Sequence, residues 1–276
     1  MRNLDQHTIT EAVLARFSDT PNPRLKEIVN SLVNHLHDFA REVKLTEEEW
    51  LQGIQYLTST GQKCSDVRQE FILLSDVLGL SMLTIALNQD KPKGCTEPTV
   101  FGPFFLENAP EYALGSDVAN GASGERCFVT GRVVGLGGEA IPGAKLNVWQ
   151  ADDEGLYDVQ YEGLGKSQAR GLLKTDEKGY FNFWTIVAEA YPIPTDGPVG
   201  TLLNATKRHP WRPAHLHFMV EAPGYERLIT HVFRDNSDYL DSDAVFGVRS
   251  SLVTDWVLQD DGTYKMDYEF VLNPTV

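Results

Sequence analysis

The sequence changes character once, in a stretch rich in Pro, Gly and Thr that runs from residue 92 to residue 102. Beyond it, short runs rich in β-branched and aromatic residues are separated by turn signals such as Gly137-Gly138 and Asp261-Gly262. The runs that we expect to be strands are Phe128–Val134, Lys145–Gln150, Tyr180–Ile186, His215–Val220, Leu228–Phe233 and Tyr264–Leu272. Many short strands without helices between them are typical of an antiparallel sandwich or barrel.

The residues before this stretch carry the signals of helix starts. Capping side chains or capping-box pairs stand at three places, which are Thr8 with Glu11, Asn22-Pro23, and Thr46 with Glu49. A fourth helix is expected to begin near Ser65 or Asp66. Apolar residues recur at the helical period from 25 to 43 and from 73 to 87. This predicts that the first of these two stretches buries one face, and that the second is buried on most sides or lies at a subunit contact.

We therefore expect two domains, a helical one over residues 1–99 and a β-sandwich over residues 100–276.

The 24 Lys+Arg and 39 Asp+Glu give a net charge of −15, which would repel nucleic acid and anionic lipid. The three cysteines are odd in number and lack Cys-x-x-Cys spacing, which argues against a disulfide framework, a zinc ribbon and an iron–sulfur cluster. We recognise no secretory signal and no membrane span, so the expected location is the cytoplasm.

The most informative segment for chemistry places two histidines, His215 and His217, two residues apart in an expected strand. Side chains alternate along a strand, so both imidazoles face one side while Leu216, Phe218 and Val220 face the other and look like core. A shared metal ion fits this geometry. A pair of ordinary strand histidines fits it about equally well, because such pairs also occur by chance.

Two histidines rarely complete a metal site, and the cysteines are not conveniently placed, so tyrosine and carboxylate remain as further ligands. Tyr157 follows the acidic turn Asp152-Asp153-Glu154, which by itself is typical of a solvated loop. Tyr191 lies in an extended, proline-stiffened loop, where it is first interpreted as a packed aromatic residue. Spacing alone selects neither tyrosine as a ligand.

A family resemblance extends over nearly the whole chain. The segments that carry it are Leu146–Tyr157, the Tyr191-Pro192-Ile193-Pro194 loop, and Arg212 followed by His215 and His217. Together they resemble the intradiol ring-cleaving dioxygenases, non-haem ferric enzymes that open catechols and have a helical domain before an antiparallel sandwich. Four segments are more similar to the hydroxyquinol 1,2-dioxygenase branch than to the catechol branch, and these are Thr96–Phe105, Arg208–His215, Leu228–His231 and Tyr239–Val248.

The resemblance implies one ferric ion per subunit. Carried over by position, its ligands are Tyr157, Tyr191, His215 and His217, with water or hydroxide completing the coordination. Arg212 would stabilise negative charge on the bound substrate. An ortho-diphenol is expected to displace the hydroxide and the Tyr191 phenolate, both of which can accept its protons. Reaction with O2 then opens the ring between the two hydroxylated carbons, which from hydroxyquinol gives 3-hydroxy-cis,cis-muconate or maleylacetate, a step of aromatic degradation.

The resemblance also implies a substrate pocket between the domains. The family's pocket positions map onto Leu73, Asp76, Val100, Phe101, Gly102, Pro103, Ala244 and Val245. Asp76 is a lone carboxylate in an apolar helix, so it is expected either to accept a hydrogen bond from the third hydroxyl of hydroxyquinol or to serve as a cap or ion-pair partner within the helices. His231 stands where catechol-cleaving relatives tend to carry glutamine, and is expected to tune the metal centre without being a ligand.

The helical domain resembles the family's dimerisation module, in which an amphiphile such as a phospholipid can occupy an apolar tunnel between the subunits of a homodimer.

Other interpretations of the function of the chain remain open. One is a catechol or chlorocatechol 1,2-dioxygenase, another is a transthyretin-like sandwich that binds a ligand without catalysis, and a third is a zinc or copper enzyme built on the same histidine pair.

Overall fold

The computed structural model describes residues 2–88 and 91–275. They fall into two compact units, Met1–Thr58 and Ser59–Val276. The helices are α1 (Ile9–Arg16), α2 (Pro23–Glu42), α3 (Glu47–Lys63), α4 (Glu70–Val77), α5 (Leu80–Leu87) and α6 (Pro198–Ala205), with short 3-10 turns η1 (Asp158–Gln160) and η2 (Ser250–Leu252). The first unit is helical, and α3 continues across the boundary into the second unit, which contains all the strands described.

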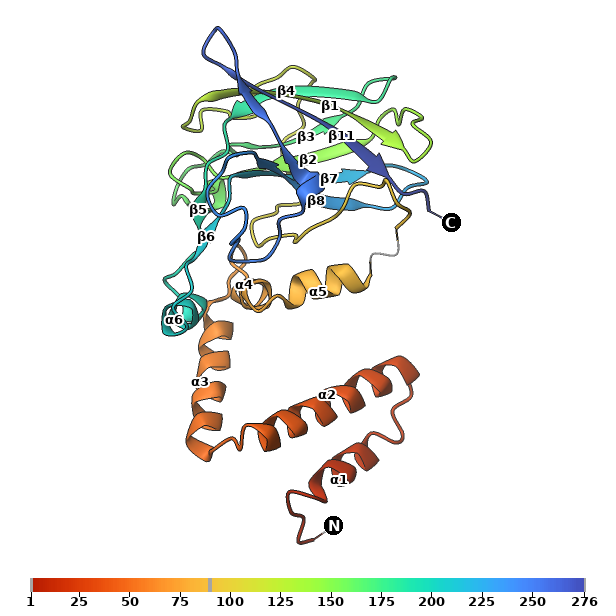
Figure 1. Ribbon diagram of the computed structural model, residues 1–276, viewed down its shortest axis with the longest axis vertical. Coiled ribbons are helices and arrows are strands. Elements are labelled where there is room, and N and C mark those ends of the chain that lie inside the picture. Colours follow the sequence, from red (N-terminus) through yellow and green to blue (C-terminus); the bar gives the residue numbers. More distant parts are fainter. Residues whose placement is uncertain (1, 89–90, 276) are drawn as a thin grey trace. The chain divides into compact units, whose positions relative to one another are not determined.

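Two sheets build the second unit. One has four strands in the order β10 (Trp256–Leu258), β11 (Tyr264–Leu272), β1 (Arg126–Gly135) and β4 (Tyr180–Ile186). The other has five strands in the order β3 (Arg170–Lys174), β2 (Lys145–Trp149), β7 (His215–Glu221), β8 (Leu228–Arg234) and β9 (Val253–Thr254). A short ribbon joins β5 (Tyr191–Pro192) to β6 (Trp211–Arg212). All six expected strands are present, and the sandwich prediction is confirmed (Figure 1).

The sheets are mixed, whereas the sequence predicted an antiparallel sandwich. β1 pairs with β11 in parallel along nine residues, and β8 pairs with β9 in parallel. Turn signals predict only pairings between strands that are neighbours in the sequence, and β1 and β11 lie at opposite ends of the sandwich sequence. Their pairing is therefore decided by the tertiary fold.

The main core lies between the two sheets. The inward faces of β1 and β7 contribute Val129, Val133, Leu216, Phe218 and Val220, all buried. The expectation for the alternate residues of β7 is therefore confirmed. The opposite face of the five-stranded sheet carries His215, His217 and Met219, which are also buried. In Figure 1, α4 and α5 lie on the β8 side of this sandwich.

Two of the three capping predictions are confirmed in full. Asn22 accepts a hydrogen bond from the backbone N–H of Leu25 at 3.0 Å. Thr46 and Glu49 form both hydrogen bonds of a capping box, at 2.9 Å and 3.2 Å. α1 does begin after Thr8, but the Thr8 hydroxyl bonds the Asp5 carboxylate in place of the helix backbone, so the capping box predicted there is wrong.

The apolar stretch from 73 to 87 forms two helices, not the single helix that its periodicity predicted. α4 begins at Glu70, later than expected. Gly79, which has a left-handed backbone conformation with φ +73°, separates α4 from α5. Among the described residues no single helix is long and apolar enough to cross a membrane, and the one pair that meets the test together, α4 and α5, is bent by 76°.

The apolar stripe of α2 is not buried within the chain, contrary to the expectation that this helix buries one face. Leu25, Ile28, Leu32, Leu36, Phe39 and Val43 are between 48% and 55% exposed. Among the described residues, these side chains form a continuous exposed apolar stripe, which is typical of an interaction surface.

Candidate metal centre

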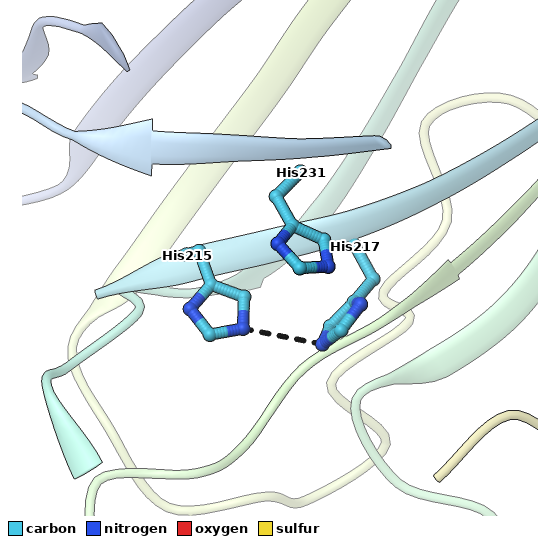
Figure 2. A group of neighbouring side chains, drawn as sticks. All are labelled: His215, His217 and His231. Atoms are coloured by element: carbon cyan, nitrogen blue, oxygen red, sulfur yellow. Dashed lines mark hydrogen bonds between the residues drawn. The ribbon is translucent and has the colours of Figure 1, made fainter. Parts of the chain in front are cut away.

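The centre is built on three adjacent strands of the five-stranded sheet. Trp149 of β2, His217 of β7 and His231 of β8 are directly paired in register, so their side chains form one row. The Trp149 ring stacks on His217 with 4.6 Å between ring centroids and 16° between planes. His231 meets His217 edge to face at 4.1 Å. Two residues along β7, His215 adds a third imidazole to this face, as Figure 2 shows.

A tight turn after β2 brings Tyr157 to the histidines. Asp152 accepts hydrogen bonds from the backbone N–H groups of Glu154 and Leu156, at 3.0 Å and 3.1 Å, and is buried. The prediction that Asp152 lies in a solvated loop is therefore wrong, because its carboxylate organises the turn. Gly155 sits at φ +79°, and a Cβ there would lie 2.7 Å from the Tyr191 Cβ. Only glycine allows these two chain segments to approach so closely.

The β5–β6 ribbon places the second tyrosine. Tyr191 is the direct register partner of Arg212, so the two side chains are cross-strand neighbours. Arg212 in turn lies three residues before His215, at the start of β7. The ribbon therefore links a tyrosine, an arginine and a histidine that are separated by 24 residues or fewer in the sequence.

Four donor atoms converge at this place. The Tyr157 Oη lies 2.8 Å from the His217 Nε2 and 3.0 Å from the Tyr191 Oη. The Nε2 atoms of His215 and His217 are 3.2 Å apart. Adjacent ligands bound at about 2.0–2.1 Å to one metal ion are roughly 2.8–3.4 Å apart for angles near those of tetrahedral or octahedral sites. The spacing of the four atoms therefore suits ligands of a single ion.

Protonation states agree with this interpretation. The Nδ1–H of His215 donates to the Pro213 carbonyl at 2.7 Å, which leaves its Nε2 lone pair facing the other donors. Burial, together with the Arg212 charge, lowers the pKa of His215 to about 3, and burial lowers the pKa of His217 well below its usual value. Both imidazoles are thus neutral and able to coordinate a metal.

The pKa values of the two phenols indicate that this group of residues is suited to hold a cation. Burial raises the pKa of Tyr157 well above its ordinary value, and it also raises the pKa of Tyr191 despite the nearby Arg212 charge. Two buried phenols pointing at each other and at neutral imidazoles are stabilised as phenolates only by a cation among them. Hard phenolate oxygens with imidazole nitrogens are a donor set that ferric iron accepts well. The residues present therefore fit a metal ion of this kind.

Arg212 is held rigidly beside the donors. Its Nη1 lies 3.1 Å from the His215 Nε2 and its Nη2 lies 3.4 Å from the His231 Nδ1. Its guanidinium forms a buried pair with Asp243, whose negative charge raises the pKa of Arg212 although burial opposes its charge. A fixed positive charge therefore stands at the edge of the centre.

Several of the residues expected to line a pocket are buried, and one of them, Gly102, lies against the centre. Leu73, Val100, Ala244 and Val245 are buried, and a Cβ on Gly102 would lie 3.2 Å from the His217 Cε1. Phe101, Gly102 and Pro103 line a cavity of about 130 Å³ with residues of the Asp66–Ile72 region. Asp76 is buried, and burial raises its pKa to about 6, although a hydrogen bond with Ser81 and the Arg212 charge both act to lower it.

Sequence reasoning missed several residues of this site. Trp149 covers one face of His217, and Phe104 stacks on Tyr157 at 4.5 Å. Asp158, directly after Tyr157, forms a buried ion pair with Arg170 at 2.6 Å. Asp243 was also missed, because it stands in a loop with several other aspartates and no local pattern distinguishes it. Only its contact with Arg212 does so.

Comparison with known proteins agrees with this geometry. Residues 100–274 match the family described as Dioxygenase, and residues 22–96 match the family described as Catechol dioxygenase N terminus. The chain belongs to the intradiol dioxygenase family. Similar members of this family include a protein of Cupriavidus pinatubonensis named 6-chlorohydroxyquinol 1,2-dioxygenase, which is 69% identical over 276 residues and all of both chains.

Two further members of the intradiol family are similar over most of their length. A protein of Rhodococcus opacus named hydroxyquinol 1,2-dioxygenase is 49% identical, with 94% of this chain and 86% of that protein covered. The solved structure of a hydroxyquinol 1,2-dioxygenase from Pseudomonas putida superposes with a TM-score of 0.89 at 47% identity, covering 98% of this chain and 99% of the other. The family resemblance and the fold expected from the sequence are therefore confirmed.

Proposed function

We propose that this protein is an intradiol dioxygenase that opens the ring of hydroxyquinol (benzene-1,2,4-triol) between its vicinal hydroxylated carbons. The observation that carries the proposal is the convergence of the Tyr157 and Tyr191 phenol oxygens with the Nε2 atoms of His215 and His217. The similar proteins named for hydroxyquinol cleavage, over nearly the whole chain, support the substrate. A purely ligand-binding sandwich has no need for two buried phenols aimed at two imidazoles.

The intradiol family uses non-haem iron, and we assign one ferric ion per subunit to Tyr157, Tyr191, His215 and His217. The neighbouring His231 offers a third imidazole within the same cluster of histidines. Its Nδ1 faces the Arg212 guanidinium, whereas the Tyr157 phenol oxygen lies beside the Tyr191 phenol oxygen and the His217 Nε2. We therefore assign His231 a place beside the ligands, where it packs against both coordinating imidazoles.

The chemistry that ferric iron supplies in this family is activation of a chelated catecholate toward O2. The protein's own residues prepare the substrate for it. Tyr191, as the phenolate beside Arg212, would be placed to take a proton from an incoming diphenol. The Arg212 Nη1 lies 3.1 Å from the His215 Nε2, where it would stabilise negative charge on an oxygen of the substrate bound beside that histidine. Trp149 and Phe104 cover His217 and Tyr157 on their ring faces, which keeps water away from the donors.

The visible absorption spectrum of the purified, iron-loaded protein tests the proposal. Phenolate bound to ferric iron gives a broad charge-transfer band, so we expect a red-brown protein with one iron per chain. Tyr157→Phe should lose or strongly shift this band, whereas Tyr180→Phe, an exposed tyrosine of β4, should not change it. A colourless protein with ferric iron verified at full occupancy would contradict the ligand assignment.

Substrate preference is tested with hydroxyquinol, 6-chlorohydroxyquinol and catechol. We propose that Asp76 accepts a hydrogen bond from the third hydroxyl, because its carboxylate is buried near Arg212 at the predicted pocket. Asp76→Ala should then lower kcat/KM for hydroxyquinol about 10-fold or more relative to catechol. Asp255→Ala, which removes an exposed carboxylate, is the control. An unchanged preference would contradict this role, and greater turnover of catechol by the unmodified protein would favour the catechol-cleaving alternative.

We further propose a homodimer formed through the N-terminal helices, with a functional domain boundary near residue 99 that lies between the two family matches. The exposed apolar stripe of α2 supplies the surface. Leu32→Glu should give monomers by light scattering and Asn34→Glu, on the polar side of α2, should not.

Mass spectrometry of extracted lipids would show whether a phospholipid is bound. The three free cysteines suit the reducing cytoplasm.

A further inference from the structure

The carboxylate of Asp243 lies beside the metal centre, makes four hydrogen bonds and has no role so far. It is 6% exposed and lies in the loop between β8 and η2. Its Oδ1 accepts a hydrogen bond from the Arg212 Nε at 3.0 Å, and its Oδ2 accepts one from the Arg212 Nη2 at 3.3 Å. This side-on pair fixes the plane of the guanidinium.

The same carboxylate also fixes the loop that contains it. Asp243 Oδ1 accepts from the Val245 N–H at 3.3 Å, and Oδ2 accepts from the Gly247 N–H at 2.9 Å. The Gly247 carbonyl is bound in turn by the Thr99 hydroxyl at 2.7 Å. Asp243 therefore connects Arg212 to two of the three segments that contain predicted pocket residues, namely 244–245 and, through Thr99, 100–103.

This junction leaves no free space. A Cβ on Gly247 would lie 3.1 Å from the Arg212 Nη2, 3.1 Å from the Asp243 Oδ2 and 2.9 Å from the Thr99 hydroxyl. Although burial opposes ionisation of Asp243, the Arg212 charge and the hydrogen bonds keep its pKa below the ordinary value, so the pair is ionic. With Nε and Nη2 engaged, Nη1 is the nitrogen directed at the His215 Nε2.

We propose that Asp243 is a positioning residue for ring cleavage, which acts by holding the Arg212 guanidinium at the angle that directs Nη1 toward the bound substrate. The inference rests on the proposed function, in which Arg212 faces charge on the substrate. Asp243 contacts none of the four assigned donor atoms, and the proposed effect on ring cleavage passes through its ion pair with Arg212. A carboxylate of the same loop that lacks this contact, Asp241, is exposed and supplies a matched control.

A double-mutant cycle tests the proposal on iron-loaded protein. Asp243→Asn keeps the size of the side chain but removes its charge, and should lower kcat for hydroxyquinol about 10- to 100-fold, with a smaller change in KM. In an Arg212→Gln background the same change should lower kcat by less than about threefold, because the group it positions is gone. Asp241→Asn should leave kcat within about twofold of the unmodified protein.

Iron content and the visible band separate this inference from the proposed function. Both should be retained in Asp243→Asn, since no ligand is changed. Equal losses of kcat in the two backgrounds, or a kcat like that of Asp241→Asn, would overturn the inference while leaving the dioxygenase assignment intact. An unmodified protein without the band or the activity would instead overturn the assignment.

A second variant covers the case in which Asp243→Asn does not fold. Gly247→Ala keeps both charges but introduces a methyl group against the ion pair. We expect it to lower kcat with iron content unchanged, and to lose this effect in the Arg212→Gln background. A Gly247→Ala protein with unchanged kcat would overturn the proposal.

Discussion

Arg170 offers the sharpest test of how the Tyr157 turn is held in place. Its side chain is 2% exposed and its partner Asp158 is 4% exposed, and the guanidinium bonds the carboxylate at 2.6 Å, 3.0 Å and 3.1 Å. Arg170→Met keeps the apolar stem but leaves a buried carboxylate without its cation. Removing one partner of a buried pair costs about 3–5 kcal/mol of unfolding free energy. For a unit of this size that corresponds to a fall in Tm of roughly 10 °C.

A control on the same strand separates burial from charge. Lys174, also in β3, pairs with Glu111 at 2.6 Å, but the two side chains are 48% and 57% exposed. Lys174→Met should therefore cost no more than about 1 kcal/mol. Combining Arg170→Met with Asp158→Asn should recover part of the stability lost in Arg170→Met alone, because no charge is then left buried.

Urea denaturation followed by fluorescence measures these differences, and iron content is measured in parallel. We expect Arg170→Met also to bind less iron, since Asp158 directly follows Tyr157 and its carboxylate also accepts the Gln168 N–H. Equal losses of stability for Arg170→Met and Lys174→Met would refute the reasoning from burial. A double variant less stable than Arg170→Met would refute the claim that the unpaired charge is the cause.

Three further predictions concern pH, the late loop and the metal. Burial raises the pKa of Asp76 to about 6, so the stability gained from its protonation is complete below pH 3.8 and is lost as the pH rises through 6, by roughly 3 kcal/mol. Relative to the unmodified protein, Asp76→Asn should therefore gain stability between pH 4 and pH 7.5 in urea titrations, and a constant difference would contradict this. Arg208 donates hydrogen bonds to the Val77 carbonyl at 2.6 Å and to the Ala244 carbonyl at 3.0 Å. Arg208→Met should therefore lower the unfolding free energy by about 2–3 kcal/mol in the same assay. A loss below about 0.5 kcal/mol would show that these bonds contribute little to stability. Removing iron by reduction and chelation should lower Tm and erase the visible band; zinc should restore Tm without the band, and a band that survives iron removal would contradict the phenolate assignment.

Local signals predicted the secondary structure well where one interaction decides the outcome. Asn22 and Thr46 cap helices as their spacing indicates, since a capping hydrogen bond involves residues three apart in the sequence. Thr8 has the same kind of spacing, yet Asp5 competes for its hydroxyl. The apolar run from 73 to 87 kept its helical period on both sides of Gly79, so the periodicity did not reveal the bend.

The candidate site shows a similar division. The alternation rule alone placed His215 and His217 on one face of β7, and the core confirms it. The prediction that Tyr157 and Tyr191 are the further ligands came from the family resemblance. Nothing in the spacing of either tyrosine distinguishes a ligand from a packed aromatic residue. The contacts of these tyrosines in the structure support the nomination.

The sequence by itself determined the helical and strand-rich parts of the chain, the face of β7 that carries the histidines and the strongly negative charge. The tertiary structure alone decided the parallel pairing of β1 with β11, the β5–β6 ribbon that sets Tyr191 opposite Arg212, and the contact of Asp243 with that arginine. The physical reason is range. Capping and alternation act over a few residues, whereas strand register and buried ion pairs join residues that are far apart in the sequence and depend on how the whole sandwich closes.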